Sequence, residues 1–529
     1  MNAALYSPSS ITTKLDYLEQ NQLLHELKNL RRGIEKESLR INPEGQLSQT
    51  SHPSVLGSAL THPYITTDFS EALLEFITPV STSIQGSLDF LERIHRYVYS
   101  QLDNELLWVT SMPCILGDDA QIPVAQFGTS NIGQMKEVYR IGLGHRYGRV
   151  MQTIAGIHYN FSIPDELWLA LQNREGSTEN FQDYKTRGYF SLIRNFRRYS
   201  WLLIYLFGAS PTVCKSFLAG KPHPLEEFDK HSLYAPYATS LRMGDLGYQS
   251  NAQDSLKVSY NDLESYSEVL DRAMKQPYPA YTEVGVEEQG EYRQLNDSLL
   301  QIENEFYSSV RPKRVTQSGE KPLHALRQRG VEYVELRCID INPFTPLGID
   351  AEQIRFIDTF LLACLLTDSP LSCDKELDCI QENQDRVVNR GRDPELKLKT
   401  LDGELSLPDA AQPLLEAMIP VADILDSLHE TEQYRFALGN QQAKIEDPEK
   451  TPSAQILRIM RDDKIPFAQF GRDHSEQIAA AMKANPLSES CHQHFDELSE
   501  QSLLDRQQIE DACEGDFPQF LDEYFAQPI

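Results

Sequence analysis

The chain has 529 residues, of which 40% are hydrophobic, and its formal net charge is -29 at pH 7. This length and composition can bury one large core, or two to three ordinary ones, without disulfides or metal staples. The acidic balance argues against nucleic-acid binding, because contacts with phosphates require Lys and Arg in excess.

Membrane and secretion signals are missing from the sequence. The longest apolar runs, Trp201–Phe207 and Phe360–Leu366, have seven residues each, whereas a bilayer span needs about 20. Residues 1–15 lack the basic and apolar pattern of a secretory signal. The eight cysteines show no CxxC pair and no zinc-finger spacing, and Cys491 with His492 and His494 is the one local cluster that offers metal binding as an alternative. We therefore expect a cytoplasmic protein with free thiols and no membrane association.

The first predicted strand, Gly33–Ile41, carries two carboxylates on one face. Period-2 alternation puts Glu35 and Glu37 side by side, next to apolar residues. Adjacent carboxylates in such a setting raise each other's pKa and destabilise the strand unless a cation lies between them. The alternative interpretation is the solvent-exposed face of an edge strand.

Acidic residues recur among apolar ones in Thr67–Pro79. Asp68 and Glu75 have opposite parity in a strand, so a turn must intervene if their side chains are to converge. An amphipathic helix is predicted next, because one face of it carries Leu88, Leu91, Ile94, Val98 and Leu102.

A clean alternation marks Gly156–Ser162 as a strand with a polar face that carries His158 and Asn160. A lone histidine on such a face is usually a hydrogen-bonded structural residue. Because His158 shares this face with the amide of Asn160, a role in binding metal or substrate is as good an interpretation as a structural role. A second long helix is predicted from Arg187 to Phe207.

The predicted strand Val331–Ile341 places Glu335 and Arg337 on one face, together with Tyr333, Ile339 and Ile341. An ion pair at this spacing in an apolar strand is costly to bury unless both groups have further partners. Phosphate and Mg²⁺ would supply them. Cys338 falls on the opposite face and has no nearby base to activate it as a nucleophile.

Helical patterning dominates from Ile349 onward, with apolar stripes over 354–365 and 414–428, although Pro420 disfavours an unbroken second helix. The last 39 residues hold ten acidic residues and one basic residue, interleaved with apolar positions. This pattern favours a packed helical end with a solvated face. The N-terminal part, by contrast, has the mixed pattern of an α+β fold.

Acidic segments with a single histidine suit hard cations such as Mg²⁺ or Mn²⁺ better than zinc. The sequence has no phosphate-binding glycine loop of the P-loop or dinucleotide type. If ATP binds, metals and arginines must hold its phosphates.

These segments closely resemble the proteobacterial glutamate-cysteine ligases from about residue 25 to about residue 370. The matching stretches are Gly33–Arg40, Leu56–His62, Ile65–Pro79, Gln126–Asn131, Ala155–Ser162, Tyr205–Pro211, Ala238–Arg242, Gln301–Tyr307, Val331–Arg337 and Asp340–Phe344. The resemblance implies an α+β fold whose curved, mostly antiparallel sheet is similar to the catalytic fold of glutamine synthetase and is flanked by helices. It implies a catalytic core with helical insertions over 1–370 and a mainly helical region over 371–529 packed on it.

The resemblance also implies site residues. Glu37, Asp68 and Glu75 would bind one Mg²⁺. Glu35, His158 and Glu335 would bind a second one that bridges the nucleotide phosphates, and Mn²⁺ is an alternative ion. Arg337 matches the arginine that contacts the transferred phosphoryl group, so Glu335 and Arg337 are the expected catalytic residues. Substrate contacts are expected from Phe69, Tyr139, Arg140, Asn160, Arg242, Tyr248 and Tyr307.

The implied reaction joins the γ-carboxylate of L-glutamate to the amine of L-cysteine, with ATP as co-substrate and γ-glutamyl phosphate as intermediate. It releases ADP and phosphate and is the first step of glutathione biosynthesis. A monomer with feedback inhibition by glutathione is expected. One alternative is a ligase of the same fold that uses another amine. The other is a catalytically silent acidic binding protein, against which the full set of matched carboxylates speaks.

Overall fold

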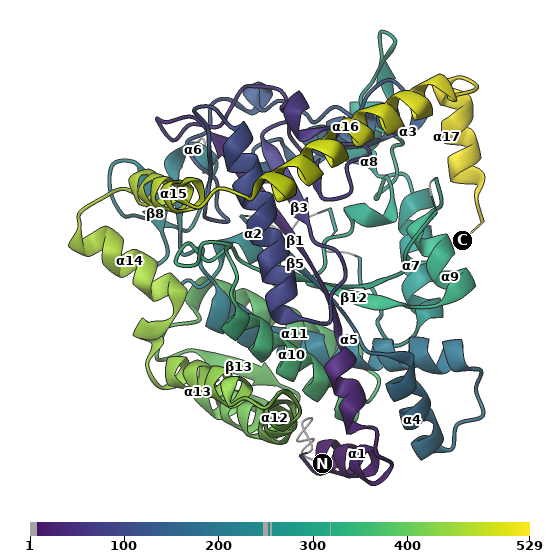
Figure 1. The fold of residues 1–529 in the computed structure, drawn as a ribbon, viewed down its shortest axis with the longest axis vertical. Coiled ribbons are helices and arrows are strands. Elements are labelled where there is room, and N and C mark those ends of the chain that lie inside the picture. The colour runs from purple at the N-terminus through teal and green to yellow at the C-terminus, as the bar shows by residue number, and fades with distance from the viewer. Residues whose placement is uncertain (1–7, 219, 247–251, 254–255, 318, 529) are drawn as a thin grey trace.

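The computed structural model describes residues 8–218, 220–246, 252–253, 256–317 and 319–528. Its centre is a seven-stranded sheet in the order β11-β12-β5-β1-β3-β2, with β4 paired to the end of β1 (Figure 1). All pairings between these strands are antiparallel. The strands span Arg31–Ile41 (β1), Ile65–Thr67 (β2), Leu73–Ile77 (β3), Leu106–Leu107 (β4), Ile157–Ser162 (β5), Val310–Lys313 (β11) and Tyr333–Ile339 (β12).

Helices from all parts of the chain surround this sheet. Those before β12 are α1 (Pro8–Gln20), α2 (Ile84–Gln101), α3 (Asn131–Tyr147), α4 (Asp165–Glu175), α5 (Phe181–Phe207), α6 (Lys215–Leu218), α7 (Leu263–Lys275), α8 (Pro279–Val284) and α9 (Pro322–Arg329). Those after β12 are α10 (Ala351–Leu366), α11 (Asp374–Arg390), α12 (Leu407–His429), α13 (Gln433–Glu446), α14 (Pro452–Asp462), α15 (Phe467–Ala484), α16 (Glu489–Asp511) and α17 (Phe517–Ala526).

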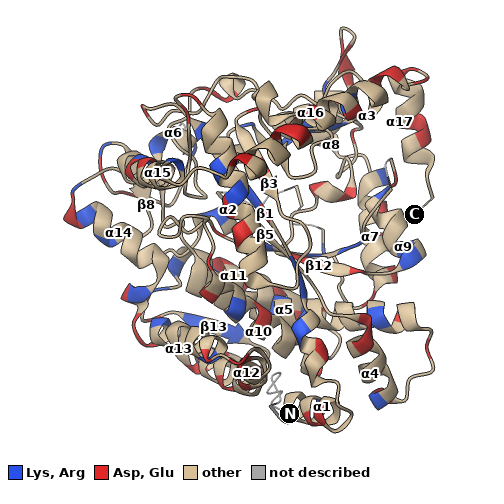
Figure 2. Cartoon of the chain, viewed as in Figure 1, with Lys and Arg blue, Asp and Glu red and all other residues tan. Residues whose placement is uncertain are grey.

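Short strands form three small sheets at the periphery. They are β6 (Thr212–Cys214), β7 (Glu226–Glu227), β8 (Ser232–Tyr234), β9 (Glu287–Glu288), β10 (Glu291–Tyr292), β13 (Lys397–Thr400) and β14 (Gly403–Ser406). Acidic and basic residues are both spread over the outer helices (Figure 2). Among the described residues, no helix combines the length and the apolar character needed to cross a bilayer.

One face of the central sheet is buried under helices α2, α5 and α10. Arg32 carries an ion pair from this face of β1 to Asp358 of α10, with 2.7 Å between the guanidinium and the carboxylate. Tyr159 of β5 donates a 2.7 Å hydrogen bond to the other oxygen of Asp358. All three side chains are buried, so the loss of one would leave an uncompensated polar group. This contact fixes which face of the sheet packs on α10 and which remains available for a site.

The fold confirms most sequence-based expectations. The predicted strand 33–41 lies in β1, the predicted strand 156–162 corresponds to β5 apart from its first residue, and the predicted helices correspond to α2, α5, α10 and α12. Helix α12 runs through Pro420, contrary to the sequence-based objection. The acidic C-terminal end is helical, in α16 and α17, with Phe495, Phe517 and Leu521 buried.

One expectation about β12 is wrong. Strict alternation placed Ile339 on the face of Glu335, but Ile339 pairs with Ile157 whereas Leu336 pairs with Tyr159. The register shift between them adds one residue to β12, as in a β-bulge, which moves the side chains that follow to the other face. Ile339 is therefore buried on the helix-covered face.

Candidate active site

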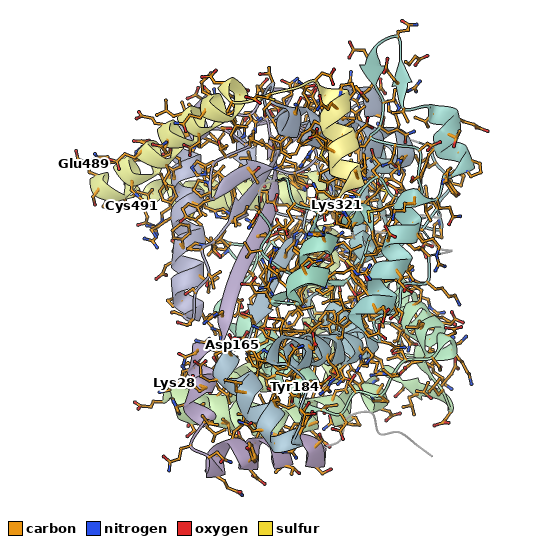
Figure 3. All side chains as sticks on the ribbon, turned by 90° about the vertical axis from the view of Figure 1, so that its right-hand side faces the viewer. Lys28, Asp165, Tyr184, Lys321, Glu489 and Cys491 are labelled. Carbon is orange, nitrogen blue, oxygen red and sulfur yellow. The ribbon has the colours of Figure 1, made fainter. Side chains whose placement is uncertain are left out.

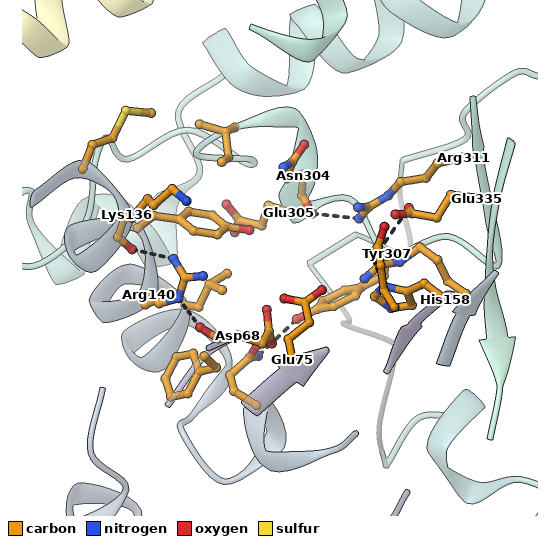
Figure 4. Close-up of a pocket in the computed structure, with 18 of the residues that line it drawn as sticks. Asp68, Glu75, Lys136, Arg140, His158, Asn304, Glu305, Tyr307, Arg311 and Glu335 are labelled. Carbon is orange, nitrogen blue, oxygen red and sulfur yellow. Dashed lines mark hydrogen bonds and ion pairs between the residues drawn. The ribbon is translucent and has the colours of Figure 1, made fainter. Parts of the chain in front are cut away.

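A cavity of about 460 Å³ lies on the face of the sheet opposite α10. Figure 4 shows Lys136 and Arg140 of α3 on one side of it, and Arg311 and Glu335 on the other. Most of the side chains predicted from the sequence line this cavity. They are Glu35, Glu37, Asp68, Phe69, Glu75, Tyr139, Arg140, His158, Tyr307, Glu335 and Arg337.

Strand register explains how residues distant in sequence meet here. Strand β1 lies between β3 and β5. Glu37 is directly opposite Glu75 of β3, and Glu35 is directly opposite His158 of β5. Directly opposed residues on antiparallel strands point to the same face. The register therefore gathers three carboxylates and one imidazole over about two residue steps of the sheet.

The turn that Asp68 and Glu75 require is present. Strand β2 ends at Thr67 and β3 begins at Leu73, and the backbone N–H of Asp68 donates to the carbonyl of Leu73, at 3.0 Å. This reversal brings Asp68 to the same cavity as Glu75. The Arg140 guanidinium donates to the backbone carbonyl of Asp68 and so ties the turn to α3.

The geometry at the centre of the sheet fits a bound cation. Ligand atoms of Glu35, Glu75 and His158 all lie within 4.8 Å of one another. Nδ1 of His158 is 3.2 Å from Glu35. Its Nε2 is buried without a hydrogen-bond partner among the described residues, 3.6 Å from a Glu37 oxygen. An unpaired buried nitrogen amid carboxylates is unfavourable unless a cation joins them. Oxygen donors with one imidazole suit Mg²⁺ or Mn²⁺.

The observed cluster combines residues from both of the metal-ligand sets that the sequence resemblance implies. Glu75 was expected at one ion, and Glu35 with His158 at the other. In the fold these three form one cluster, with Glu37 beside it. Two ions that share this small region would lie close together.

The carboxylates repel one another without a cation. Burial raises the pKa of Glu75 well above its usual value, and the charges of Glu35, Asp68 and Glu37 raise it further. Burial also raises the pKa of Glu37, more than the nearby His158 lowers it. A perturbed cluster of this kind in a cavity is typical of a functional site.

Glu335 has the opposite electrostatic setting. Burial acts to raise its pKa, but Lys313, Arg337 and His158 outweigh burial and hold the pKa well below its usual range. Lys313 lies 3.2 Å and Arg337 3.3 Å from its carboxylate oxygens. Glu335 is therefore a charged acceptor that holds two cationic side chains at the rim of the acidic cluster.

Two predicted substrate residues within the described part of the chain, Asn160 and Arg242, do not line the cavity. Asn160 donates a 2.7 Å hydrogen bond to Glu35. Arg242 is fully buried, donates a 2.8 Å hydrogen bond to the carbonyl of Arg337, and lies 3.7 Å from Asp340. Asn160 and Arg242 therefore hold residues that line the cavity without lining it themselves. Tyr248 lies outside the described residues.

Sequence reasoning missed several basic residues of the cavity. Arg311 and Lys313 alternate on β11, where Arg311 is directly opposite Glu335. Lys136 precedes Arg140 by one helical turn on α3, and burial lowers its pKa to about 8. The period-2 spacing of the first pair and the i, i+4 spacing of the second were the available signals.

The aromatic residues of the cavity are held by neighbours. The hydroxyl of Tyr307 accepts a 3.1 Å hydrogen bond from Gln152, and Tyr147 packs edge-on against its ring. The backbone carbonyl of Tyr139 accepts from Gln301 at 3.2 Å. Cys338 is buried, and burial raises the pKa of its thiol to about 12, so it is not a thiolate at neutral pH.

Relatives of this chain span nearly its whole length. The family model described as glutamate-cysteine ligase matches residues 15–387. The glutamate-cysteine ligase of Saccharophagus degradans is 52% identical over 504 residues, which cover 95% of this chain and 95% of that protein.

Solved structures give the same picture. The crystal structure of a glutamate-cysteine ligase from Francisella tularensis, in complex with AMP, has a TM-score of 0.88 and 36% identity, over 94% of this chain and 97% of that one. A bifunctional glutathione synthetase from Pasteurella multocida has a TM-score of 0.68 and 25% identity, over 91% of this chain and 57% of that one. The likeness thus extends beyond residue 370 into the C-terminal helices, and it agrees with the α+β fold.

Proposed function

Because the chain belongs to the glutamate-cysteine ligase family, we propose that it joins the γ-carboxylate of L-glutamate to the amine of L-cysteine, using ATP. The product is γ-glutamylcysteine, and the reaction is the first step of glutathione biosynthesis. One structural observation carries most weight: the converging ligand atoms of Glu35, Glu75 and His158, with a cationic rim on one side.

The chemistry needs both charge types. A carboxylate is a poor electrophile, so an oxygen of the γ-carboxylate attacks the terminal phosphorus of ATP and ADP leaves. The cysteine amine then attacks the resulting acyl phosphate, and inorganic phosphate leaves with the former carboxylate oxygen. Such transfers depend on positioning and on the stabilisation of negative charge.

Arg337, Lys313 and Arg311 would hold the transferred phosphoryl group. Arg337 has a planar guanidinium that binds two phosphate oxygens at once. Lys313 and Arg311 extend the cationic edge along β11. Glu335 fixes Arg337 and Lys313 through its two short contacts. The hydrogen bond from Arg242 to the Arg337 carbonyl holds the backbone beneath them.

We infer that the acidic cluster holds Mg²⁺, with Mn²⁺ as a substitute. The ligands would be Glu35, Glu37, Asp68, Glu75, His158 and Glu335, which allows two or more ions. When bound, such ions offset the charge on phosphate and carboxylate oxygens. Asn160 orients Glu35 toward this role through its amide hydrogen bond.

The amino acids would lie at the α3 side of the cavity. Arg140 and Lys136 supply positive charge for a substrate carboxylate, and Phe69, Tyr139 and Tyr307 supply apolar walls for the cysteine side chain. A partly buried cation of this kind attracts anionic ligands strongly because water screens it little. Arg242 and Tyr248 remain predicted substrate residues, and Arg242 would act through Arg337, to whose backbone carbonyl it donates at the phosphoryl side of the cavity.

The proposed function is tested by ADP release with each amino acid omitted in turn. Full release should need glutamate and cysteine together, and ammonia or other amines should replace cysteine poorly. Hydroxylamine should yield γ-glutamyl hydroxamate, and labelled oxygen from the γ-carboxylate should appear in phosphate. Equal turnover with an unrelated amine would point instead to another carboxylate-amine ligase. Label that stayed out of phosphate would exclude the acyl phosphate.

Two further properties belong to this proposal. Glutathione contains the γ-glutamylcysteine unit that the cavity would form, so it should inhibit by competing with glutamate. The chain should elute as a monomer in size-exclusion chromatography with light scattering. Inhibition that glutamate cannot relieve, or a stable dimer, would contradict these expectations.

A further inference from the structure

Two cationic side chains at the α3 side of the cavity have no salt-bridge partner among the described residues. Lys136 and Arg140 are four residues apart on α3, and both line the cavity. Like charges at this spacing on a helix repel each other. Burial adds to the cost of keeping them charged, and it lowers the pKa of both side chains. Another group must therefore stabilise this pair of charges.

The ring of Phe127 is within reach of both charges. The guanidinium carbon of Arg140 lies 4.4 Å from the ring centroid, and the ammonium of Lys136 lies 5.2 Å from it. The face of an aromatic ring carries negative electrostatic potential, and its attraction for a cation is stronger away from water. Phe127 is buried and does not line the cavity. Its ring therefore serves these two side chains and not a ligand.

Backbone carbonyls fix the remaining sides of the Arg140 guanidinium. Its Nε donates to the carbonyl of Asp68, and its Nη1 donates to the carbonyl of Lys136 at 2.9 Å. Figure 4 shows both contacts at the edge of the cavity. The Nη2 group has no hydrogen-bond partner among the described residues, so it is available to an anion in the cavity.

The loop that carries Phe127 is held to the turn between β2 and β3. The N–H of Ala125 donates to the carbonyl of Phe69 at 3.0 Å, and the N–H of Gln126 donates to the Glu71 carboxylate at 2.7 Å. Glu71 is the acid of this turn that does not line the cavity. Its buried carboxylate instead fixes the backbone next to Phe127.

Helix α16 holds the same loop from the other side. This helix begins at Glu489, at the edge of the molecule in Figure 3. Near its last turn, the Glu510 carboxylate accepts a 2.8 Å hydrogen bond from the N–H of Thr129. Gly128 has a φ of +88°, and a Cβ at this position would lie 2.2 Å from a Glu510 oxygen. The glycine therefore permits the close approach that fixes the position of Phe127.

We propose that Phe127 is a positioning residue, which holds Lys136 and Arg140 together as a paired cationic site for the carboxylate of an amino-acid substrate. The inference rests on the proposed function, which supplies that carboxylate. An aliphatic side chain of similar size would fill the space but would not offset the two charges. The cations would then separate and bind the carboxylate less tightly. The nucleotide phosphates would lie at the β11 and β12 edge, so their binding should not depend on this ring.

The test replaces Phe127 with phenylalanines that carry one, two or three ring fluorines, introduced by amber suppression. Fluorine weakens the negative potential of the ring face and changes its size little. The KM for the amino acid whose carboxylate binds here should rise stepwise, to roughly tenfold with three fluorines. The KM for ATP and the kcat should change less than twofold. Phe127→Leu should raise the same KM at least as far.

The matched control is the same substitution at another ring that lies beside a cation. Phe90 of α2 has the guanidinium carbon of Arg93 at 5.1 Å from its centroid and does not line the cavity. Phe90→Leu should leave every KM within twofold of the wild type.

The fluorinated series decides between the charge of the ring and its shape. KM values for glutamate and cysteine that both stay within twofold through the series would overturn the proposal, even if Phe127→Leu raises one of them. An equal rise in the KM for ATP would also overturn it, because the two cations would then serve the phosphates. Failure of the proposed function would look different: ADP release by the wild type would not depend on glutamate and cysteine.

Discussion

Replacement of Glu75 by Gln should separate the stability of the acidic cluster from its activity. Glu75 lies directly opposite Glu37, and its ligand oxygen lies within 4.8 Å of those of Glu35 and His158. With an effective dielectric constant of about 20, two like charges at that distance repel by about 3 kcal/mol. Burial and the neighbouring carboxylates raise the pKa of Glu75, which favours its neutral form and opposes the repulsion, so we take the repulsion by one neighbour as the expected gain.

The shift in melting temperature follows from the size of the chain. An unfolding entropy of about 2.1 cal/mol/K per residue gives roughly 1.1 kcal/mol/K for 529 residues. The metal-free Glu75→Gln protein should therefore melt up to about 3 °C above the metal-free wild type. Activity should fall by at least about 100-fold, close to 2.7 kcal/mol, because one charged ligand is lost from a site that stabilises transferring charge.

Thermal melts in EDTA and in Mg²⁺, combined with ADP release, measure both effects. The wild type should gain more stability from Mg²⁺ than the variant, since a ligand that binds the native state stabilises it in proportion to its affinity. Glu166→Gln, which removes one charge from the exposed surface of α4, is the matched control. An active Glu75→Gln enzyme that melts at or below the wild type in EDTA would refute this account of the cluster.

Three further substitutions probe other parts of the structure. Arg337→Lys should lower kcat/KM by roughly 100-fold or more because an ammonium cannot bind two phosphate oxygens in one plane; activity within twofold of wild type would place Arg337 outside the site. Burial lowers the pKa of His62 to about 4, so the folded protein resists protonation and loses stability as pH falls below about 6.5, by roughly 2 kcal/mol at pH 5. His62→Asn should remove that part of the loss in urea unfolding at pH 7.5 and 5, and an unchanged difference would contradict the assignment. Gly156→Ala would push a methyl group into the Arg242 guanidinium and should cost about 1–3 kcal/mol of stability together with activity, whereas Gly33→Ala, with ordinary contacts, should cost less of both.

Local patterns predicted the elements that carry the acidic cluster. Glu35 and Glu37 share a face because strand alternation is strict within β1, and His158 follows the same rule in β5. Which strands lie next to each other in the sheet is a long-range property that no local pattern contains. It follows from the sheet order, which places β5 and β3 on either side of β1.

The missed features have identifiable physical causes. Pro312 in the middle of β11 argues against a strand, yet β11 is an edge strand, where a proline is tolerated. Local patterning therefore gives little indication that Arg311 and Lys313 lie in the sheet. The bulge in β12 lies where the regular alternation ends, at the adjacent apolar residues Cys338 and Ile339, and the sequence does not show to which face each of them turns. Tyr524 of α17 lines the cavity. Lys321 donates hydrogen bonds to the carbonyls of Phe525 and Gln527, about 200 residues later in the sequence, and so holds this end of the chain in place.

The distribution of charge in the cavity resolves how so acidic a chain could bind anionic substrates. A net charge of -29 repels phosphates and carboxylates at long range, but salt screens exposed charges beyond roughly 10 Å. Within the cavity the carboxylates of the cluster gather on β1 and β3, and Arg311, Lys313 and Arg337 surround Glu335 at the β11 and β12 edge. A substrate anion placed between them would meet cationic side chains on one side and, through bound metal ions, the carboxylates on the other. The acidic cluster would then help to bind an anion only with its metals in place, so removal of Mg²⁺ should weaken ATP binding far more than it weakens the fold.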